Sequence, residues 1–211
     1  EKGSSQESGC KTGGDACPPD LPRRHFQYCN ALFANQYGPC EAVINSSTAV
    51  YSADNVPERA TIGHPIPGCD IVIVDPREQL APIGVPGELW IGGPFLADGY
   101  LGDEKTTREK FARRDFGNGT QIYYRSGDRG RWLDGGDIEF LGRMDRQVQL
   151  NGMRLELDEI EAEIGANSAV RYSRVLEIKK QGHSTLAAFV TPNFDAGCLT
   201  SVSQQWSDAF D

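Results

Sequence analysis

The segment from residue 37 to residue 41 (YGPCE) holds side chains that could bind a nucleotide together with a metal ion. The Gly38-Pro39 pair favours a tight bend, so Tyr37 and Glu41 should project from a loop in fixed directions. An aromatic ring can stack on a flat base, and a carboxylate is an oxygen ligand of the kind that Mg²⁺ takes. Taken by itself, such a short segment is more often a surface turn that carries a solvated glutamate.

Three further segments are rich in glycine and charge. Residues 125–128 (RSGD) follow a short apolar stretch, and a carboxylate on such a turn can accept two hydrogen bonds from a vicinal diol such as a ribose. Residues 142–145 (GRMD) and 151–154 (NGMR) are basic and also contain glycine. Each segment by itself could be an ordinary turn.

The elements that would position these residues are short strands. Residues 69–74 are β-branched and end at an Asp-Pro turn, and residues 87–93 form a similar run bounded by glycine. Two more strands are predicted at residues 122–125 and 137–141, before and after a turn that contains residues 134–136. Short strands at close spacing favour a compact, barrel-like β subdomain.

The pattern changes in the last third of the chain. Apolar residues there recur at the spacing of an amphipathic helix, at Leu157, Ile160 and Ile164. Residues 170–178 and 185–191 are then typical of a pair of strands. We therefore place a boundary near Asp145, with a β-rich body before it and a small α+β lobe after it.

Composition excludes several classes of function. The 211 residues include 21 Lys and Arg against 30 Asp and Glu, and this net charge of −9 argues against a nucleic-acid partner. No apolar run approaches the roughly 18 residues of a membrane span, and the first residues do not resemble a signal peptide. The six cysteines show no C-x-x-C pair, which disfavours a zinc site and predicts reduced thiols in a cytoplasmic protein.

Taken together, these segments resemble the adenylate-forming enzyme superfamily, in particular the adenylation domain of nonribosomal peptide synthetases. Residues 35–41 (NQYGPCE) are similar to N-x-Y-G-P-T-E, and residues 87–101 (GELWIGGPFLADGYL) to G-E-L-x-I-x-G-x-x-V-A-R-G-Y-L. Residues 124–128 (YRSGD) are similar to Y-[RK]-T-G-D, and residues 142–161 to G-R-x-D-x-Q-V-K-I-R-G-x-R-I-E-L-x-E-I-E. The resemblance runs from about residue 13 to residue 190 and covers the C-terminal half of such a domain.

The resemblance implies a fold and a reaction. Residues 1–143 would form the β-rich end of the large α/β core, residues 144–195 part of a mobile α+β lid, and residues 196–211 a linker. In the family an amino acid attacks the α-phosphate of ATP-Mg²⁺, which gives an aminoacyl adenylate and pyrophosphate. The acyl group then passes to the phosphopantetheine thiol of a carrier (thiolation) domain, among the other domains of the synthetase.

The resemblance also assigns roles to single residues. It places the nucleotide against Gly14, Asp15, Asn35, Tyr37, Tyr124, Asp128 and Arg143. In that assignment Tyr37 stacks on adenine, Asp128 binds the ribose hydroxyls and Arg143 lies near the ribose and phosphate. Glu41 would hold Mg²⁺, and Glu41 and Arg143 would be the catalytic residues.

The remaining implied positions concern the amino acid and the carrier arm. The acyl-recognition pocket would include Gly13, Gln36, Ile44 and Asn45. Asp145 falls on the hinge position of the family, where few residues absorb a large change of backbone angles. Gly152 would line the pantetheine tunnel, because a residue without a side chain permits close approach.

Some residues depart from the family pattern and leave alternatives open. Cys40 stands for Thr, Asp98 for Arg, Gln149 for Lys and Asn151 for Arg. These changes either weaken anion contacts or only remodel the surface, and they also fit a degenerate, non-catalytic scaffold. An acyl- or aryl-CoA ligase of the same superfamily is a further alternative, although residues 147–148 and 154–157 are closer to the peptide-synthetase form.

Three elements of the family have no match in the sequence. These are the phosphate loop S-G-[ST]-T-G-x-P-K-G, the upstream aspartate that holds the substrate's amino group, and the lysine of an N-G-K-x-D segment. We therefore expect the chain to be a fragment or part of a longer protein. Residues 203–211 (SQQWSDAFD) resemble the opening of the methyltransferase insert of some N-methylating synthetases, or form an ordinary lobe helix or linker.

We expect the 211-residue chain alone to be inactive in adenylation, since it would hold the nucleotide on one side only. The measurement is ATP–pyrophosphate exchange with the chain in the presence of Mg²⁺ and mixed amino acids. Exchange above a protein-free blank would contradict this expectation.

Overall fold

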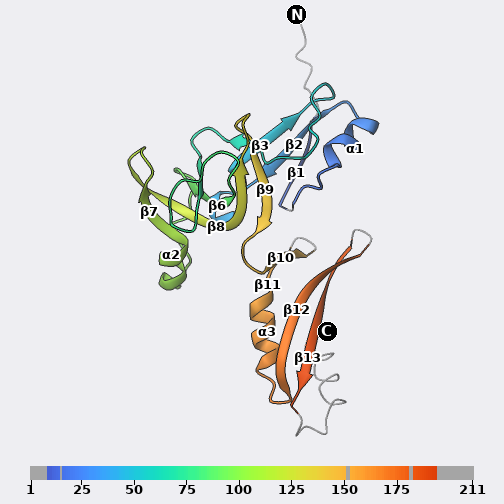
Figure 1. Ribbon diagram of the computed structural model, residues 1–211, viewed down its shortest axis with the longest axis vertical. Coiled ribbons are helices and arrows are strands. Elements are labelled where there is room, and N and C mark those ends of the chain that lie inside the picture. The colour runs from blue at the N-terminus through green and yellow to red at the C-terminus, as the bar shows by residue number, and fades with distance from the viewer. Residues whose placement is uncertain (1–8, 15, 151–152, 181–182, 194–211) are drawn as a thin grey trace, which may run out of the picture. The chain divides into compact units, whose positions relative to one another are not determined.

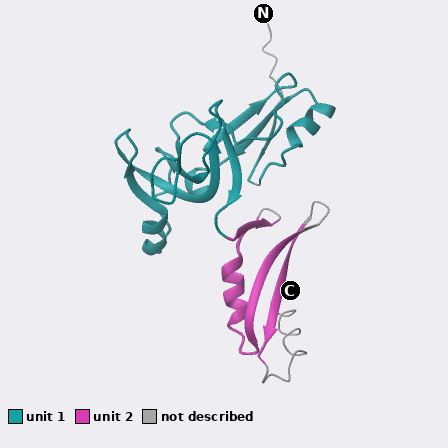
Figure 2. Ribbon diagram, in the orientation of Figure 1, with its two compact units in different colours: residues 1–145 teal, residues 146–211 magenta. Residues whose placement is uncertain are grey.

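The computed structural model describes residues 9–14, 16–150, 153–180 and 183–193 (Figure 1). The chain divides into two compact units, Glu1–Asp145 and Arg146–Asp211 (Figure 2). The division falls directly after Asp145. Among the described residues, no helix combines the length and apolar character that crossing a membrane requires.

The first unit begins with a four-stranded sheet. Its strands, in spatial order, are β1 (Gly9–Gly13), β2 (Leu32–Tyr37), β3 (Ser47–Tyr51) and β4 (His64–Pro65). The β1 and β2 strands are parallel, so a crossover must join them, and helix α1 (Leu21–Tyr28) provides it. One face of the sheet packs Phe33, Ala49 and Tyr51 against Leu21 and Phe26 of this helix.

A five-stranded antiparallel sheet completes the first unit. Its strands are β5 (Asp70–Val74), β6 (Gly87–Gly92), β7 (Phe111–Asp115), β8 (Thr120–Trp132) and β9 (Ile138–Arg143). The spatial order is β5-β6-β8-β7, and β9 pairs with β8 as well. Helix α2 (Glu104–Lys110) precedes β7, and Asp103 caps it by accepting a hydrogen bond from the Thr106 amide.

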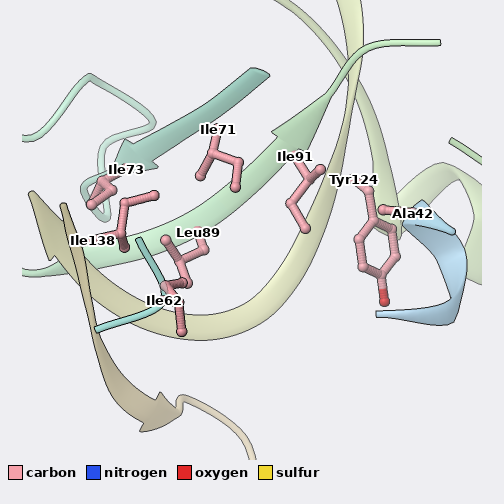
Figure 3. Close-up of a cluster of buried hydrophobic side chains, with 8 residues drawn as sticks. All are labelled: Ala42, Ile62, Ile71, Ile73, Leu89, Ile91, Tyr124 and Ile138. Atoms are coloured by element: carbon pink, nitrogen blue, oxygen red, sulfur yellow. The ribbon is translucent and has the colours of Figure 1, made fainter. Parts of the chain in front are cut away.

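The main hydrophobic core lies on one face of this sheet (Figure 3). It contains Ala42, Ile62, Ile71, Ile73, Leu89, Ile91, Tyr124 and Ile138. Two of these residues, Ala42 and Ile62, come from outside the five strands. The core therefore fixes the segment that follows β2 against the centre of the larger sheet.

The four strands predicted for this region are confirmed, but the barrel-like closure is not. Within the described residues the sheets stay open, and the segment next to β4 meets β9 through an isolated bridge between Gly63 and Ile138. This contact is short, with one hydrogen bond from the Ile62 amide to the Ile138 carbonyl and one from the Ile138 amide to the Gly63 carbonyl. An isolated bridge of this length does not join the two sheets into a closed barrel.

In its described residues, the second unit contains two hairpins and one helix. Its elements are β10 (Gln147–Leu150), β11 (Met153–Glu156), α3 (Leu157–Gly165), β12 (Val170–Lys180) and β13 (His183–Pro192). The predicted helix and both predicted strands are therefore confirmed. Leu157 and Ile164 of α3 pack on Val175 of β12, with Leu186 and Val190 of β13 at the edge of this cluster.

A partly exposed ion pair ties the helix of the second unit to its long hairpin. The Arg146 guanidinium donates to both carboxylate oxygens of Glu161, at 2.7 Å each, and to the Val175 carbonyl at 2.6 Å. The Val175 amide in turn donates to Glu161. The Arg146 hydrogen bonds and the Val175 amide lower the pKa of Glu161 to about 2.

This lowered pKa predicts an acid-sensitive second unit. The pair stabilises the fold above the ordinary glutamate pKa of about 4.3, and that stability is lost as the pH falls toward 2. A Glu161→Gln variant should therefore lose much of this pH dependence. The measurement is the urea midpoint of the Val175 amide resonance between pH 2.5 and 6, with Glu159→Gln, an exposed acid of the same helix, as the control. Equal profiles for the two variants would refute the role of the pair.

Candidate functional site

The site is organised by an irregularity in β8. Between two paired positions of β6 and β8, β6 contributes a single residue, Leu89, whereas β8 contributes the three residues 126–128. We call residues 126–128 the β8 bulge. Its middle residue, Gly127, has a φ of +73°, and a Cβ there would lie 2.9 Å from an oxygen of Asp145. A residue with a side chain would be strained at this position.

The polar groups of the β8 bulge have partners on neighbouring strands. The Ser126 hydroxyl donates to the Leu89 carbonyl at 2.6 Å and accepts from the Asp128 amide at 3.0 Å. The Gly127 amide donates to the Glu88 carboxylate at 3.0 Å, and its carbonyl accepts from the Met144 amide at 2.7 Å. Ser126 is fully buried, so these bonds hold the bulge without help from solvent.

The bulge directs Asp128 toward two residues that are distant in sequence. The Tyr37 hydroxyl, at the end of β2, donates to Oδ2 of Asp128 at 2.6 Å. Nη1 of Arg143, which faces Asp128 across the β8–β9 ladder, donates to Oδ1 at 3.0 Å. The Tyr37 ring also packs against Phe140 of β9, with 5.9 Å between ring centroids. Three of the predicted nucleotide-binding residues thus form one hydrogen-bonded group.

Burial dominates the electrostatics of this group. Only 6% of Asp128 is exposed, and burial raises its pKa, against the opposing effects of the Tyr37 hydrogen bond and the Arg143 charge. Burial and the nearby Asp128 charge raise the pKa of Tyr37 well above its usual range. Burial disfavours the charge of Arg143, but its bonds to Asp145 and the Asp128 charge raise its pKa overall. The phenol therefore stays a donor and the guanidinium a cation.

Glu41 lies four residues beyond Tyr37, in the 3₁₀ helix η1 (Cys40–Ala42). The Tyr100 hydroxyl donates to Oε1 of Glu41 at 2.7 Å and lies 3.4 Å from the Tyr124 hydroxyl. Burial and these two neighbours raise the pKa of Tyr100, so it acts as a donor to the carboxylate. The Ala97 amide donates to the Glu41 carbonyl, which also anchors η1.

The segment after η1 is tightly folded and strained. Val43 and Ile44 have φ angles of 55° and 67°, a left-handed conformation that β-branched residues rarely adopt. Ile44 is exposed, and a Cβ on Gly38 would lie 2.6 Å from its carbonyl oxygen. Asn45 accepts a hydrogen bond from Thr48 at 3.1 Å. Two of the predicted pocket residues, Ile44 and Asn45, thus lie on the loop that carries Glu41.

Four further predicted residues lie in β1, directly after β1, or in β2. Gly13 of β1 lies opposite Gln36 of β2, and Gly14 follows with a φ of +85°. Asn35 is buried, and its amide donates to the Thr61 carbonyl at 2.7 Å, so its side chain is already engaged inside the first unit. Asp15 and Gly152 lie outside the described residues.

Asp145, the residue predicted to be the hinge, also contacts this group. Nε of Arg143 donates to Oδ1 of Asp145 at 2.8 Å, and the second terminal nitrogen of Arg143 bonds the other carboxylate oxygen. Arg143 is therefore held by two carboxylates, one on the bulge and one at the end of the first unit.

Sequence reasoning did not single out Glu88, Tyr100 or Ser126. All three lie in segments whose letters resemble the family, namely residues 87–101 and 124–128. Their roles depend on which strands pair and in which register, and that information is not contained in a local pattern.

Comparison with known proteins finds relatives in both sequence and fold. The family model described as AMP-binding enzyme matches residues 3–101. Bacitracin synthase 3 of Bacillus licheniformis is 37% identical over 185 residues, which cover 87% of this chain and 3% of that protein. Among solved structures, PA1221, an NRPS protein containing adenylation and PCP domains, superposes with a TM-score of 0.78 at 30% identity, over 90% of this chain and 39% of that one.

A second solved structure is the adenylation domain AlmE of Vibrio cholerae, in complex with glycyl-adenosine-5′-phosphate. It superposes with a TM-score of 0.74 at 27% identity, and the match covers 86% of this chain and 35% of that one. The chain therefore belongs to the AMP-binding adenylation domains of nonribosomal peptide synthetases. It spans 3% of the length of the curated relative and 35–39% of the two solved chains.

The bond between Tyr37 and Asp128 gives a direct test of the geometry. A Tyr37→Phe variant keeps the ring but removes a donor from a buried carboxylate, which should cost about 2 kcal/mol of stability and raise the pKa of Asp128 further. The measurements are urea unfolding and a ¹³C titration of the Asp128 carboxyl. Tyr28→Phe is the matched control because Tyr28 is 89% exposed. If both variants behave alike, the hydrogen bond does not form in solution.

Proposed function

We propose that this chain supplies the nucleotide-binding side of an adenylation domain that activates an amino acid as its aminoacyl adenylate. The observation that carries the proposal is the convergence of Tyr37 of β2 and Arg143 of β9 on the buried carboxylate of Asp128 in β8. An aromatic ring, an acid and a guanidinium are the groups that a base, a ribose and a phosphate respectively require. The family membership of the chain supports the same nucleotide.

Asp128 retains the capacity to bind a ribose. An ionised carboxylate has about four lone-pair sites, and Tyr37 and Arg143 each occupy one. The remaining sites can accept the two ribose hydroxyls. Because Tyr37 and Arg143 hold the carboxylate from both sides, its oxygens are oriented before the nucleotide arrives, which reduces the entropy lost on binding.

The residues present fit a bound Mg²⁺. Within the ranges that the structure describes, no group of three or more His, Cys, Asp or Glu residues could hold a metal ion. Mg²⁺ in nucleotide enzymes usually takes one or two carboxylates together with phosphate oxygens and waters, so Glu41 alone is a sufficient protein ligand. Bound there, the ion would offset charge on the phosphates. Tyr100 would orient the Glu41 carboxylate through its hydrogen bond.

The remaining partners follow from the same family. The activated amino acid would pass to the phosphopantetheine thiol of a carrier domain, and PA1221 is a relative that contains both adenylation and PCP domains. Asp145, at the end of the first unit, would act as the hinge between the two units. Gln36, Ile44 and Asn45 would border the amino-acid pocket. Gly152 would line the passage for the carrier arm.

Saturation-transfer NMR with AMP tests the nucleotide site on the chain itself, because it detects weak binding. We expect saturation of the adenine and ribose protons, and roughly tenfold weaker binding to an Asp128→Asn variant, the loss of about one charged hydrogen bond. Asp134→Asn, an exposed acid in a turn, is the control and should bind as the wild type does.

A second ligand makes this experiment specific for the ribose contact. AMP without its 2′ and 3′ hydroxyls should bind the wild type about as weakly as AMP binds Asp128→Asn, and the variant should not distinguish the two ligands. No saturation of AMP by the wild type, or equal binding by Asp128→Asn, would overturn the proposed function.

A further inference from the structure

Glu88, the second residue of β6, is a carboxylate that the nucleotide assignment leaves without a role. Its side chain is 17% exposed, and its two oxygens have different partners. Oε1 accepts the Gly127 amide of the β8 bulge at 3.0 Å, and Oε2 accepts the indole N–H of Trp90 at 2.8 Å. The carboxylate thus connects the bulge to the buried indole beside it.

Oε2 of Glu88 is held by Trp90 and Arg125. The Arg125 guanidinium lies over the Trp90 ring, 4.9 Å from its centroid, and Nε of Arg125 lies 3.9 Å from Oε2 of Glu88. Trp90 itself is 1% exposed. A cation and a buried N–H donor therefore fix the carboxylate, so that Oε1 is presented to the bulge in one orientation.

The bulge needs this acceptor because its residues leave the β6–β8 ladder. The Asp128 amide is satisfied by Ser126 within the bulge, and the Gly127 amide is satisfied by Glu88 across it. The same short segment accepts from Arg143 at the Ser126 carbonyl, at 2.9 Å. A shift of the bulge would therefore move Asp128 and loosen Arg143 together.

We propose that Glu88 is a positioning residue for the nucleotide site, acting through the Gly127 amide on Asp128 and Arg143. This inference rests on the proposed function and adds a residue that does not touch the nucleotide. Glu88 sets the direction of the Asp128 carboxylate, so its loss lowers the affinity for the ribose while the sheet remains folded.

A Glu88→Gln variant tests this role with little change of volume. The Gly127 amide and the Trp90 indole donate to different oxygens of Glu88, and a glutamine in the same position has an NH₂ group in place of one of them. One of the two donors therefore loses its acceptor. The matched control is Glu78→Gln. Glu78, like Glu88, forms an ion pair with Arg125, and it also pairs with Arg114. Glu88→Ala serves as the more severe variant.

The first readout needs no nucleotide. In ¹⁵N–¹H spectra of the full chain, Glu88→Gln should shift the Gly127 amide and the Arg143 Nε–H, whereas Glu78→Gln should leave both in place. A change confined to the Trp90 indole resonance would mean that Glu88 only supports that ring, and would overturn the inference.

The second readout is AMP binding by saturation transfer. We expect roughly a threefold to tenfold loss for Glu88→Gln, no loss for Glu78→Gln, and no further loss when Glu88→Gln is added to Asp128→Asn. Wild-type affinity in Glu88→Gln would overturn the positioning role and leave the nucleotide site intact. Failure of the wild type to bind AMP would instead overturn the proposed function, even if the Gly127 and Arg143 resonances moved as expected.

Discussion

The structure of the first unit depends on one constraint: backbone amides that leave the β6–β8 ladder must find acceptors inside the protein. Ser126 and Glu88 provide those acceptors, at 3.0 Å each. The cost of an unsatisfied buried amide keeps the bulge in this single conformation. Because the bulge is fixed, the Asp128 carboxylate is held where Tyr37 and Arg143 can both donate to it. The need of these amides for acceptors therefore determines the position of the Asp128 carboxylate.

The same group connects parts of the chain that are far apart in sequence. Tyr37 ends β2, and the loop that follows it carries Glu41, whose carboxylate is held by Tyr100. Arg143 ends β9 and is shared between Asp128 and Asp145. The bulge thus lies between the loop that would hold the metal ion and the last residue of the first unit. The left-handed backbone after Glu41 is stored strain of the kind found at functional sites.

Sequence patterns predicted individual strands and a helix correctly, but not how the strands are arranged in sheets. Runs of β-branched residues and a helical spacing at Leu157, Ile160 and Ile164 are local signals, and β5, β6 and α3 follow them. The barrel-like closure was wrong because it depends on pairing between distant strands, and the segment next to β4 meets β9 through an isolated bridge. The motifs led to Tyr37, Glu41, Asp128 and Arg143, whereas Glu88 became visible only through the register of β6 against β8. The motifs also led to Asn35, but in the structure its side-chain amide donates to the Thr61 carbonyl.

A crystal structure of the chain with AMP is the most direct test of the central claim that these residues surround one nucleotide. We expect the adenine ring against Tyr37, both ribose hydroxyls within hydrogen-bonding distance of Asp128, and the phosphate beside Arg143. AMP bound on another surface, with Asp128 still contacting only protein groups, would contradict it.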